Sequence, residues 1–251
     1  ETCKHIHSEA TLFRYISLNK KYSLTYCEAL DFRNKVSSLV VNKGTQLALN
    51  LTMNDKAQDM TILAGVHALN LSHCENVTDV SALGGVTTLD LSHCNVTDVS
   101  ALGGVTTLDL SHCNVTDVSA LGGVTTLNLS HCENVADVSA LGGVTNLYLS
   151  GCPGITDVSA LGGVTSLYLS RSGITDVSAL GGVTNLYIYD CTGITDVSAL
   201  GGVTTLYLSN CPGITDVSAL GGLRSLYLFD CPGITDVSAL GGVTTLNIFC
   251  C

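Results

Sequence analysis

The phrase Thr-Asp-Val-Ser-Ala-Leu-Gly-Gly recurs every 19 or 20 residues from Thr78 onward, and it constrains the fold more than any other feature. A period in this range is typical of a solenoid, in which each repeat forms one coil and buries its apolar side against neighbouring coils. The sequence therefore predicts one continuous stack over residues 46–251. The leucines that open successive Leu-Gly-Gly segments mark the period: Leu83, Leu102, Leu121, Leu141, Leu161, Leu180, Leu200, Leu220 and Leu240.

A second pattern precedes each phrase, and its positions can be numbered as places 1 to 11 with Val86 at place 1. In residues 86–96 the apolar side chains fall at places 1, 4, 6 and 11, and the Leu-x-Leu centre alternates as a short strand does. This segment resembles the LxxLxLxxNxL motif of leucine-rich repeat proteins, with Cys94 in the Asn place. The Cys-x-x-Ile-Thr-Asp of residues 211–216 is similar to cysteine-containing repeats often attached to F-boxes.

The resemblance implies a mostly β solenoid of the α/β type, wound as a right-handed coil with parallel strands on one face. With a degenerate coil at residues 49–54, we expect eleven strands spaced about 4.8 Å apart. The recurring phrase is too short for a full helix, so it predicts an outer wall of 3₁₀ or β-turn segments. The Gly-Gly pair is expected to re-enter the next strand through positive φ angles. Because this wall is thin, we expect a nearly straight rod.

Two residue columns are interpreted as structural. Place 9 holds Cys in most coils but Ser172 and Asn54 in two, which suits a small buried group bonded to backbone rather than a disulfide framework or a metal site. One Asp per coil precedes Val-Ser, where it can cap a short helical turn; calcium binding is the alternative. The cysteines are Cys74, Cys94, Cys113, Cys132, Cys152, Cys191, Cys211, Cys231 and Cys251; the aspartates are Asp79, Asp98, Asp117, Asp137, Asp157, Asp176, Asp196, Asp216 and Asp236.

The coils differ from one another mainly at places 5, 7 and 8, which we expect to line the exposed strand face. In the C-terminal coils place 5 is tyrosine: Tyr148, Tyr168, Tyr187, Tyr207 and Tyr227. Place 7 adds Tyr189 and Phe229 beside this stripe. Tyrosine offers a large amphipathic contact area with little rotamer entropy to lose, so the stripe predicts a partner-binding surface. The alternative is that the rings only stack on one another and stabilise the sheet.

In the N-terminal coils place 8 is histidine: His73, His93, His112 and His131. Imidazoles on neighbouring coils could share a divalent metal, change charge together near pH 6, or form an exposed polar ladder. We include this column in the predicted partner-binding face and assign no metal and no cofactor to it.

Composition excludes several classes of function. The net charge of −11 argues against a nucleic-acid backbone as ligand, because such binding depends on clustered Lys and Arg. Every apolar run is interrupted well before the roughly 18 residues that a membrane span needs. The chain has no nucleophile elbow, phosphate loop or HExxH motif, so we do not expect an enzyme. The column of unpaired thiols predicts an intracellular, cytoplasmic protein.

Residues 1–45 do not repeat and are more basic and aromatic than the coils. The sequence predicts a helical cap that shields the first coil, with helical residues around Ser8–Arg14 and Cys27–Val36. The run Cys3-Lys4-His5, followed by residues 12–18, resembles the final helix and exit of an F-box, so the cap is interpreted as an F-box remnant. F-box segments joined to uniform repeats resemble proteins of large DNA viruses.

The last coil has no cap, since the chain reaches Cys251 in mid-coil. An open strand edge favours pairing with another chain, which predicts end-to-end self-association or burial in an assembly there; the alternative is a further C-terminal part beyond the given sequence. The leading interpretation is a protein–protein interaction scaffold. The alternatives are a structural component of a larger assembly such as a virion, and the substrate-recognition part of an F-box ubiquitin-ligase receptor.

Overall fold

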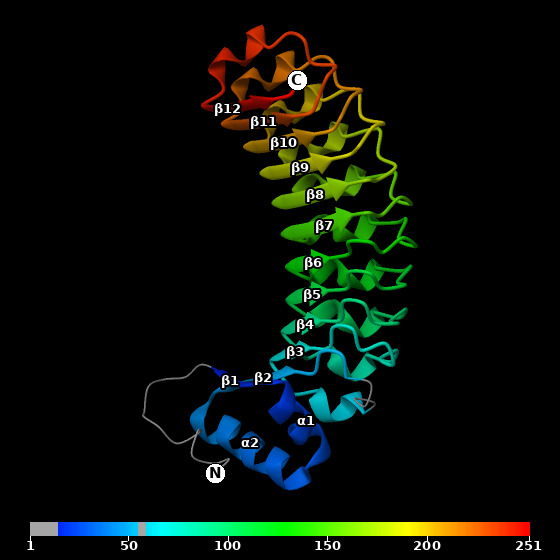
Figure 1. The fold of residues 1–251 in the computed structure, drawn as a ribbon, viewed down its shortest axis with the longest axis vertical. Helices are drawn as coiled ribbons and strands as arrows, with labels where there is room; N and C mark the ends of the chain where they lie inside the picture. Colours follow the sequence, from blue (N-terminus) through cyan, green and yellow to red (C-terminus); the bar gives the residue numbers. More distant parts are fainter. Residues whose placement is uncertain (1–14, 55–58) are drawn as a thin grey trace.

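A computed structural model of the chain describes residues 15–54 and 59–251 (Figure 1). These residues form a single 12-stranded parallel sheet whose strands lie side by side in sequence order. The strands are β1 (Tyr15–Leu18), β2 (Gln46–Asn50), β3 (Ala68–Asn70), β4 (Thr88–Asp90), β5 (Thr107–Asp109), β6 (Thr126–Asn128), β7 (Asn146–Ser150), β8 (Ser166–Ser170), β9 (Asn185–Tyr189), β10 (Thr205–Ser209), β11 (Ser225–Phe229) and β12 (Thr245–Phe249). The helices are α1 (Lys20–Glu28) and α2 (Leu30–Lys43).

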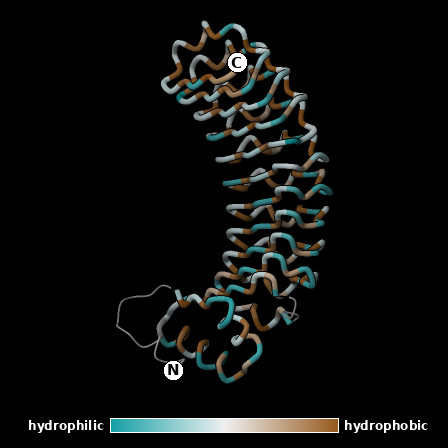
Figure 2. The backbone as a smooth tube through the Cα atoms, viewed as in Figure 1, coloured by the Kyte–Doolittle hydropathy of each residue, from teal (hydrophilic) through white to brown (hydrophobic). Residues whose placement is uncertain are grey.

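Strands β2 to β12 are the eleven predicted coil strands, and each is followed in the chain by a loop and, up to β11, by a 3₁₀ turn. The register keeps equivalent places opposite one another, so that Leu206 pairs with Leu186 on one side and Leu226 on the other. The leucines at places 4 and 6 are buried along the stack, and Leu91 and Leu110 are fully buried. Figure 2 shows the resulting alternation of apolar and polar segments in every coil. Since a fully buried leucine contributes about 1.5–3 kcal/mol, the stack is held together by this continuous core.

The outer wall consists of 3₁₀ turns, as predicted. Their bounds are η2 (Met60–Leu63), η3 (Ser81–Leu83), η4 (Ser100–Gly104), η5 (Ser119–Gly123), η6 (Ser139–Gly143), η7 (Ser159–Gly163), η8 (Ser178–Gly182), η9 (Ser198–Gly202), η10 (Ser218–Gly222) and η11 (Ser238–Gly242). The expected positive φ of the Gly-Gly pairs is wrong, because the positive-φ glycines are Gly44 and Gly151. The first glycine of the pair is instead needed for close packing. A Cβ on Gly103 would lie 2.5 Å from the carbonyl oxygen of Ala120 in the next coil.

The solenoid is a gentle arc rather than the nearly straight rod that we expected, and the bend is clearest toward β12 (Figure 1). The strands run along its inner side and the loops along its outer side. Backbone hydrogen bonds hold neighbouring strands about 4.8 Å apart, whereas the loops are not held to that spacing. Most C-terminal coils carry 20 residues, with the extra residue in the loop that follows the strand. We attribute the bend to this added length on the loop side.

The N-terminal part of the described chain covers the first coil with a strand and two helices. Strand β1 pairs in parallel with β2, and Asn19 caps α1 by accepting a hydrogen bond from the backbone N–H of Tyr22 at 3.2 Å. The buried Ser23 hydroxyl donates to the Leu18 carbonyl oxygen at 3.0 Å and accepts from the Asn50 N–H at 2.9 Å, which ties α1 to the strands on either side. None of the described helices is both long and apolar enough to cross a bilayer.

This region corrects part of the sequence prediction. The helix expected over Cys27–Val36 is present but divided, because α1 ends at Glu28 and α2 begins at Leu30. The last residues of the run that resembles an F-box helix, Tyr15–Leu18, form strand β1 instead of a helix. The other residues of that run, and the helix expected over Ser8–Arg14, lie outside the described part of the chain.

Candidate partner-binding face

The outward strand face changes character at place 5, between β6 and β7. From β3 to β6 place 5 is Asn or Asp, and its side chain accepts a hydrogen bond from the backbone N–H of place 7. Asp109 Oδ1 accepts from the Ser111 N–H at 2.8 Å, and Asn128 Oδ1 accepts from the Ser130 N–H at 3.0 Å. Such local bonds compete with the sheet ladder. Strands β3 to β6 accordingly end at place 5 and are three residues long.

Tyrosine at place 5 offers no such acceptor, and the strands with tyrosine continue to place 7. Strands β7 to β11 are each five residues long. From β3 to β11 the place 5 residue therefore goes with both the surface chemistry and the length of the strand, whereas β12, with Asn247 at place 5, still runs to Phe249. This link was not predicted, although the Asx-turn preference of Asn and Asp is visible in the sequence.

The five place 5 tyrosines form one continuous stack, which we call the tyrosine column: Tyr148, Tyr168, Tyr187, Tyr207 and Tyr227. The ring centroids of successive members lie 4.4, 4.2, 4.7 and 4.0 Å apart, and the planes tilt by 12°, 4°, 17° and 1°. All five side chains are half-buried. Each such ring pair adds about 0.5–1.5 kcal/mol beyond area burial. The predicted mutual stacking is confirmed, and it leaves the ring edges available to a partner.

The hydroxyl groups of the column influence one another. Burial against neighbouring groups raises the pKa of Tyr168 to about 12, and bonding and repulsion between its hydroxyl and that of Tyr187 add to the effect. Burial likewise raises the pKa of Tyr207 to about 12, with a further contribution from Tyr227. Tyr168 and Tyr207 therefore keep neutral hydroxyls at neutral pH.

Two further aromatic side chains of the predicted site lie on the same face at place 7. Tyr189 and Phe229 end strands β9 and β11, and Ser209 ends β10 between them. Both aromatic side chains are half-buried. Burial raises the pKa of Tyr189, and the neighbouring Tyr187 adds to this. Place 7 thus brings these two residues to the tyrosine column, as the sequence predicts.

The four place 8 histidines also stack, and we call them the histidine column: His73, His93, His112 and His131. Their ring centroids lie 4.2, 4.1 and 4.4 Å apart, with planes within 12° of parallel. The expectation that place 8 lines the sheet face is wrong. Each histidine lies beyond its strand with a positive φ between 58° and 60°. The place 8 residues of later coils, Arg171, Asp190, Asn210 and Asp230, also have positive φ. Gly and Asn favour the left-handed conformation, so Gly151 and Asn210 at place 8 were the signal in the sequence that this place is a turn residue.

Stacking sets what the histidine column can do chemically. The nitrogen lone pairs of an imidazole lie in the ring plane, so parallel stacked rings direct them side by side rather than toward one shared ion. Within residues 15–54 and 59–251, no three His, Cys, Asp or Glu side chains are arranged to hold a metal ion. Partial burial and the charges of His93 and His131 lower the pKa of His112, because a proton there is poorly solvated and faces two more imidazoles.

The cysteine column lies inside the coils and has the structural role that the sequence predicts. Cys94 is buried, and its thiol donates to the Leu71 carbonyl oxygen of the preceding coil at 3.1 Å. Cys113 and Cys132 bond the preceding coil in the same way at the same distance. Burial raises the pKa of Cys94 to about 12, so its thiol stays protonated at neutral pH. The cysteines of the described residues are free of disulfides.

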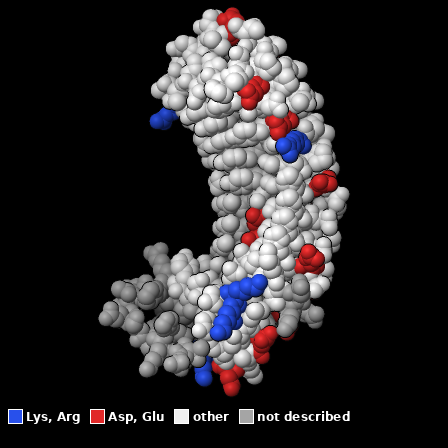
Figure 3. Space-filling view, in the orientation of Figure 1, with Lys and Arg blue, Asp and Glu red and all other residues white. Residues whose placement is uncertain are grey.

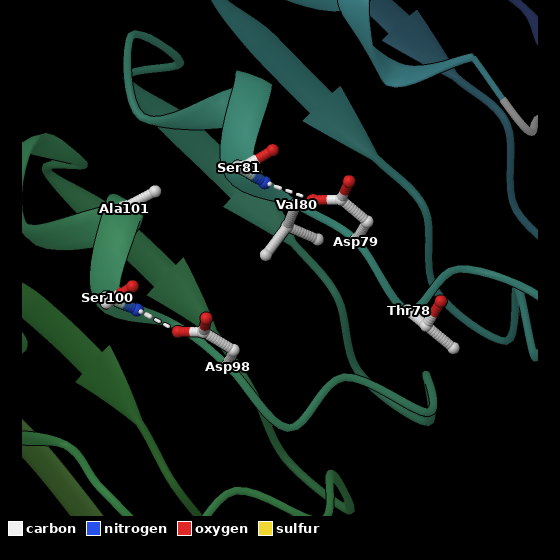
Figure 4. Close-up of a pocket in the computed structure, with 7 residues that line it drawn as sticks. All are labelled: Thr78, Asp79, Val80, Ser81, Asp98, Ser100 and Ala101. Carbon is white, nitrogen blue, oxygen red and sulfur yellow. Dashed lines mark hydrogen bonds between the residues drawn. The ribbon is translucent and has the colours of Figure 1, made fainter.

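The aspartate column caps the outer wall, which confirms the capping interpretation. Asp79 Oδ1 accepts a hydrogen bond from the Ser81 N–H at 2.9 Å, and Asp98 does the same for Ser100 at 2.9 Å (Figure 4). These bonds lower the pKa of both carboxyls. A hollow of about 230 Å³ lies between the two turns, and similar hollows follow between later coils. Figure 3 shows acidic groups scattered along the solenoid and few Lys or Arg in that view.

Comparisons with known proteins agree with this architecture. A sequence model described as "Leucine Rich repeat" matches residues 86–102 and 105–121. The structure is similar to an internalin (inlF) from Listeria monocytogenes, with 28% sequence identity, a TM-score of 0.63, and coverage of 82% of this chain and 65% of that one. The chain therefore has the leucine-rich repeat fold. It spans about 65% of the internalin chain.

A second solved structure, a leucine-rich repeat protein from Leptospira interrogans, shares the fold. It has 15% identity and a TM-score of 0.54, and the match covers 81% of this chain and 66% of that one. A search of curated proteins finds no match to this chain. Neither the F-box resemblance nor the viral resemblance is among these matches.

Proposed function

We propose that this leucine-rich repeat protein is a non-enzymatic scaffold that binds a protein partner on its strand face, over β7 to β11. Leucine-rich repeat proteins are commonly protein–protein interaction modules. The observation that carries the proposal is the tyrosine column, with Tyr189 and Phe229 beside it on the same face. The sequence prediction also includes the histidine column, but this column stands on turn residues beyond strands β3 to β6, and the proposal is centred on the tyrosine column without it.

The tyrosine column has the physical properties of a binding surface. Stacking on both sides holds Tyr168, Tyr187 and Tyr207 in place before any partner arrives, so little side-chain entropy remains to be lost on binding. Each ring offers an apolar edge for contact and a hydroxyl for hydrogen bonding. A flat strand face with such anchors suits a partner's folded surface or extended segment.

The test is affinity capture from an extract of the source organism with the intact chain as bait. The variant carries Tyr168→Ala, Tyr187→Ala and Tyr207→Ala, and circular dichroism first establishes that it keeps the wild-type fold. The matched control carries His93→Asn, His112→Asn and His131→Asn, because asparagine tolerates the left-handed backbone conformation of place 8. We expect the tyrosine variant to lose a partner that both other baits retain. Equal recovery by all three folded baits would remove the tyrosine column as the site.

A second candidate function is association through the edge strand β12. Leu246, Ile248 and Phe249 on this strand are exposed by 41, 37 and 62%, whereas their counterparts at places 4 and 6 of β11, Leu226 and Leu228, are fully buried. Where no further coil follows β12, we propose that another chain or assembly covers this edge. Light scattering over a range of concentrations tests it, since association through β12 raises the mass with concentration and Ile248→Lys prevents that rise. A constant monomer mass would contradict this proposal.

The cellular setting is a proposal as well. The free cysteines of the described chain are compatible with a reducing compartment, so we propose an intracellular, cytoplasmic protein, with a place in a virion or in an F-box ubiquitin-ligase receptor as narrower alternatives. Localisation of a tagged chain in cells tests the compartment. Recovery of the chain in purified particles, or with ubiquitin-ligase subunits, separates the two alternatives.

A further inference from the structure

One position on the outward strand face breaks an aromatic row. At place 7 the register sets Tyr189 opposite Ser209, and Ser209 opposite Phe229. A small side chain therefore stands between two aromatic ones on three successive strands. The adjoining tyrosine column is unbroken across the same strands, from Tyr187 to Tyr227.

The strand spacing defines what the row lacks at Ser209. Strands β9 and β11 are two steps apart, which is about 9.6 Å in a parallel sheet. In the tyrosine column each successive strand carries one ring, and the centroids of rings on neighbouring strands lie 4.0 to 4.7 Å apart. One further planar group over Ser209 would complete the row between Tyr189 and Phe229.

The charges beside this position select among planar groups. Asp190 follows Tyr189 directly and Asp230 follows Phe229, with Asn210 between them at the end of β10. Asp190 Oδ1 accepts a hydrogen bond from Asn210 Nδ2 at 2.8 Å, which orients this carboxylate along the row. The missing group is thus bracketed by two rings on the strands and by two carboxylates at the strand ends.

One of the two carboxylates beside this position already pairs with a guanidinium in the chain itself. Arg171, at place 8 of the preceding coil, donates from Nε to Asp190 Oδ2 at 3.2 Å. The Arg171 side chain is 70% exposed, so the ion pair forms at the surface without a buried pocket. Both Asp190 oxygens already accept one hydrogen bond, from Arg171 and from Asn210, so a second guanidinium would share these acceptors and would find a further carboxylate on Asp230.

We infer that the partner on this face presents an arginine side chain, which inserts between Tyr189 and Phe229 over Ser209 and bonds to Asp190 and Asp230. A guanidinium is planar, stacks on aromatic faces and carries donors in a fork that matches carboxylates. Lysine lacks the plane, and a neutral aromatic side chain gains nothing from the carboxylates. The net charge of −11 further favours a basic segment. This inference rests on the proposed function of the strand face.

The test uses short blocked peptides with the intact ¹⁵N-labelled chain. Acetyl-Gly-Arg-Gly-amide is titrated at millimolar concentration, and acetyl-Gly-Lys-Gly-amide, acetyl-Gly-Trp-Gly-amide and acetyl-Gly-Gly-Gly-amide are the comparison probes. We expect the arginine peptide to shift the amide signals of Ser209 and Asn210, and to bind about tenfold tighter than the lysine peptide. Equal shifts from both cationic peptides, or stronger binding of the tryptophan peptide, would overturn the inference.

Two variants locate the interaction. Ser209→Phe fills the missing position and should abolish binding of the arginine peptide. Ser150→Phe is the matched control, because it adds the same ring at place 7 of β7, away from Tyr189 and Phe229. The double variant Asp190→Asn with Asp230→Asn should weaken binding by about tenfold. Peptide binding that survives Ser209→Phe contradicts the proposed insertion.

The same variants separate this inference from the proposed function. A captured partner that is lost with the tyrosine-column variant but retained with Ser209→Phe leaves the scaffold function standing and refutes the arginine insertion. A partner that both variants retain refutes the tyrosine face itself.

Discussion

Strands β3 to β6 and strands β7 to β11 share one coil design but present two different surfaces. In the first group, Asn or Asp at place 5 turns its side chain back onto the backbone and the strand stops. In the second group, tyrosine at the same place lets the strand continue and stacks on its neighbours. The comparison teaches that, from β3 to β11, one variable place on an otherwise uniform scaffold goes with both the strand length and the chemistry of the strand face.

The two stacks also differ in how they are supported. The tyrosine column stands on strand residues and is half-buried, whereas the histidine column stands on left-handed turn residues beyond the strand and is exposed. Both run along the solenoid because the repeat places equivalent residues one strand apart. Only the tyrosine column is therefore expected to contribute strongly to the free energy of unfolding.

The largest expected effect comes from breaking the tyrosine column at its centre. Tyr187→Ala removes two ring contacts and should lower the free energy of unfolding by about 1–3 kcal/mol. The matched change in the other column, His112→Asn, should cost less than about 1 kcal/mol, because the ring is exposed and Asn tolerates positive φ. Urea unfolding of both variants checks this. Equal losses would contradict the difference in support.

Placing tyrosine at place 5 of β5 and β6 sharpens the comparison. The double variant Asp109→Tyr with Asn128→Tyr removes both Asx-type acceptors and adds two rings to the column beside Tyr148. We expect β5 and β6 to lengthen to place 7 and stability to rise by about 1 kcal/mol, as new ring contacts outweigh the lost hydrogen bonds. NMR chemical shifts of Leu110 and Ser111 report the strand length. Strands that still end at place 5 would show that tyrosine is not what extends them.

Alkaline pH should act on the tyrosine column. The pKa of Tyr168 and Tyr207 is raised to about 12, against about 10 for a free tyrosine. Between those values the unfolded chain has released protons that the folded chain retains, so these tyrosines make stability fall as the pH rises above about 10, in addition to the decline that buried cysteines such as Cys94 cause from about pH 9. Thermal melts at increasing pH measure this, and Tyr207→Phe should flatten the decline. An identical decline in that variant would exclude Tyr207 as a source.

Acid pH should act on the histidine column, with the smallest effect. The pKa of His112 is lowered, so below about pH 6.5 the unfolded chain takes up a proton that the folded chain resists. Stability is therefore full above that pH and declines as the pH falls through the lowered value. The capping aspartates have pKa values lowered from 3.8 and do not titrate in this window. A pH series from 7 to 5 should show the decline in wild type and less of it in His112→Asn.

Much of the architecture could be predicted from the sequence because the repeat imposes it. Leu91 and Cys94 recur at fixed places, and a fixed place in a stack has one environment, so their burial follows from the period. The hydrogen bond that Asp79 accepts from the Ser81 N–H follows from the local preference of Asp for the backbone N–H two residues later. Gly103 was assigned to the correct segment for the wrong reason, because close approach to Ala120 depends on the neighbouring coil rather than on local backbone.

The candidate site was predicted less completely. Tyr187 and Phe229 were identified because they vary between otherwise identical coils, and the structure brings them to one face. His112 was identified by the same variation but was expected on the strand itself, whereas it is a turn residue with positive φ beyond the end of the strand. The strand length depends on whether a side chain captures the backbone N–H two residues later, which only the folded geometry reveals.

Amide hydrogen exchange tests the partner-binding face most directly. The exchange rates of the intact chain are compared with and without the purified partner recovered by capture. We predict slower exchange across β7 to β11, strongest near Tyr187 and Ser209, with β3 to β5 and the outer wall unchanged. Protection confined to the 3₁₀ turns, or to the histidine column, would contradict the assignment of the tyrosine column as the binding face.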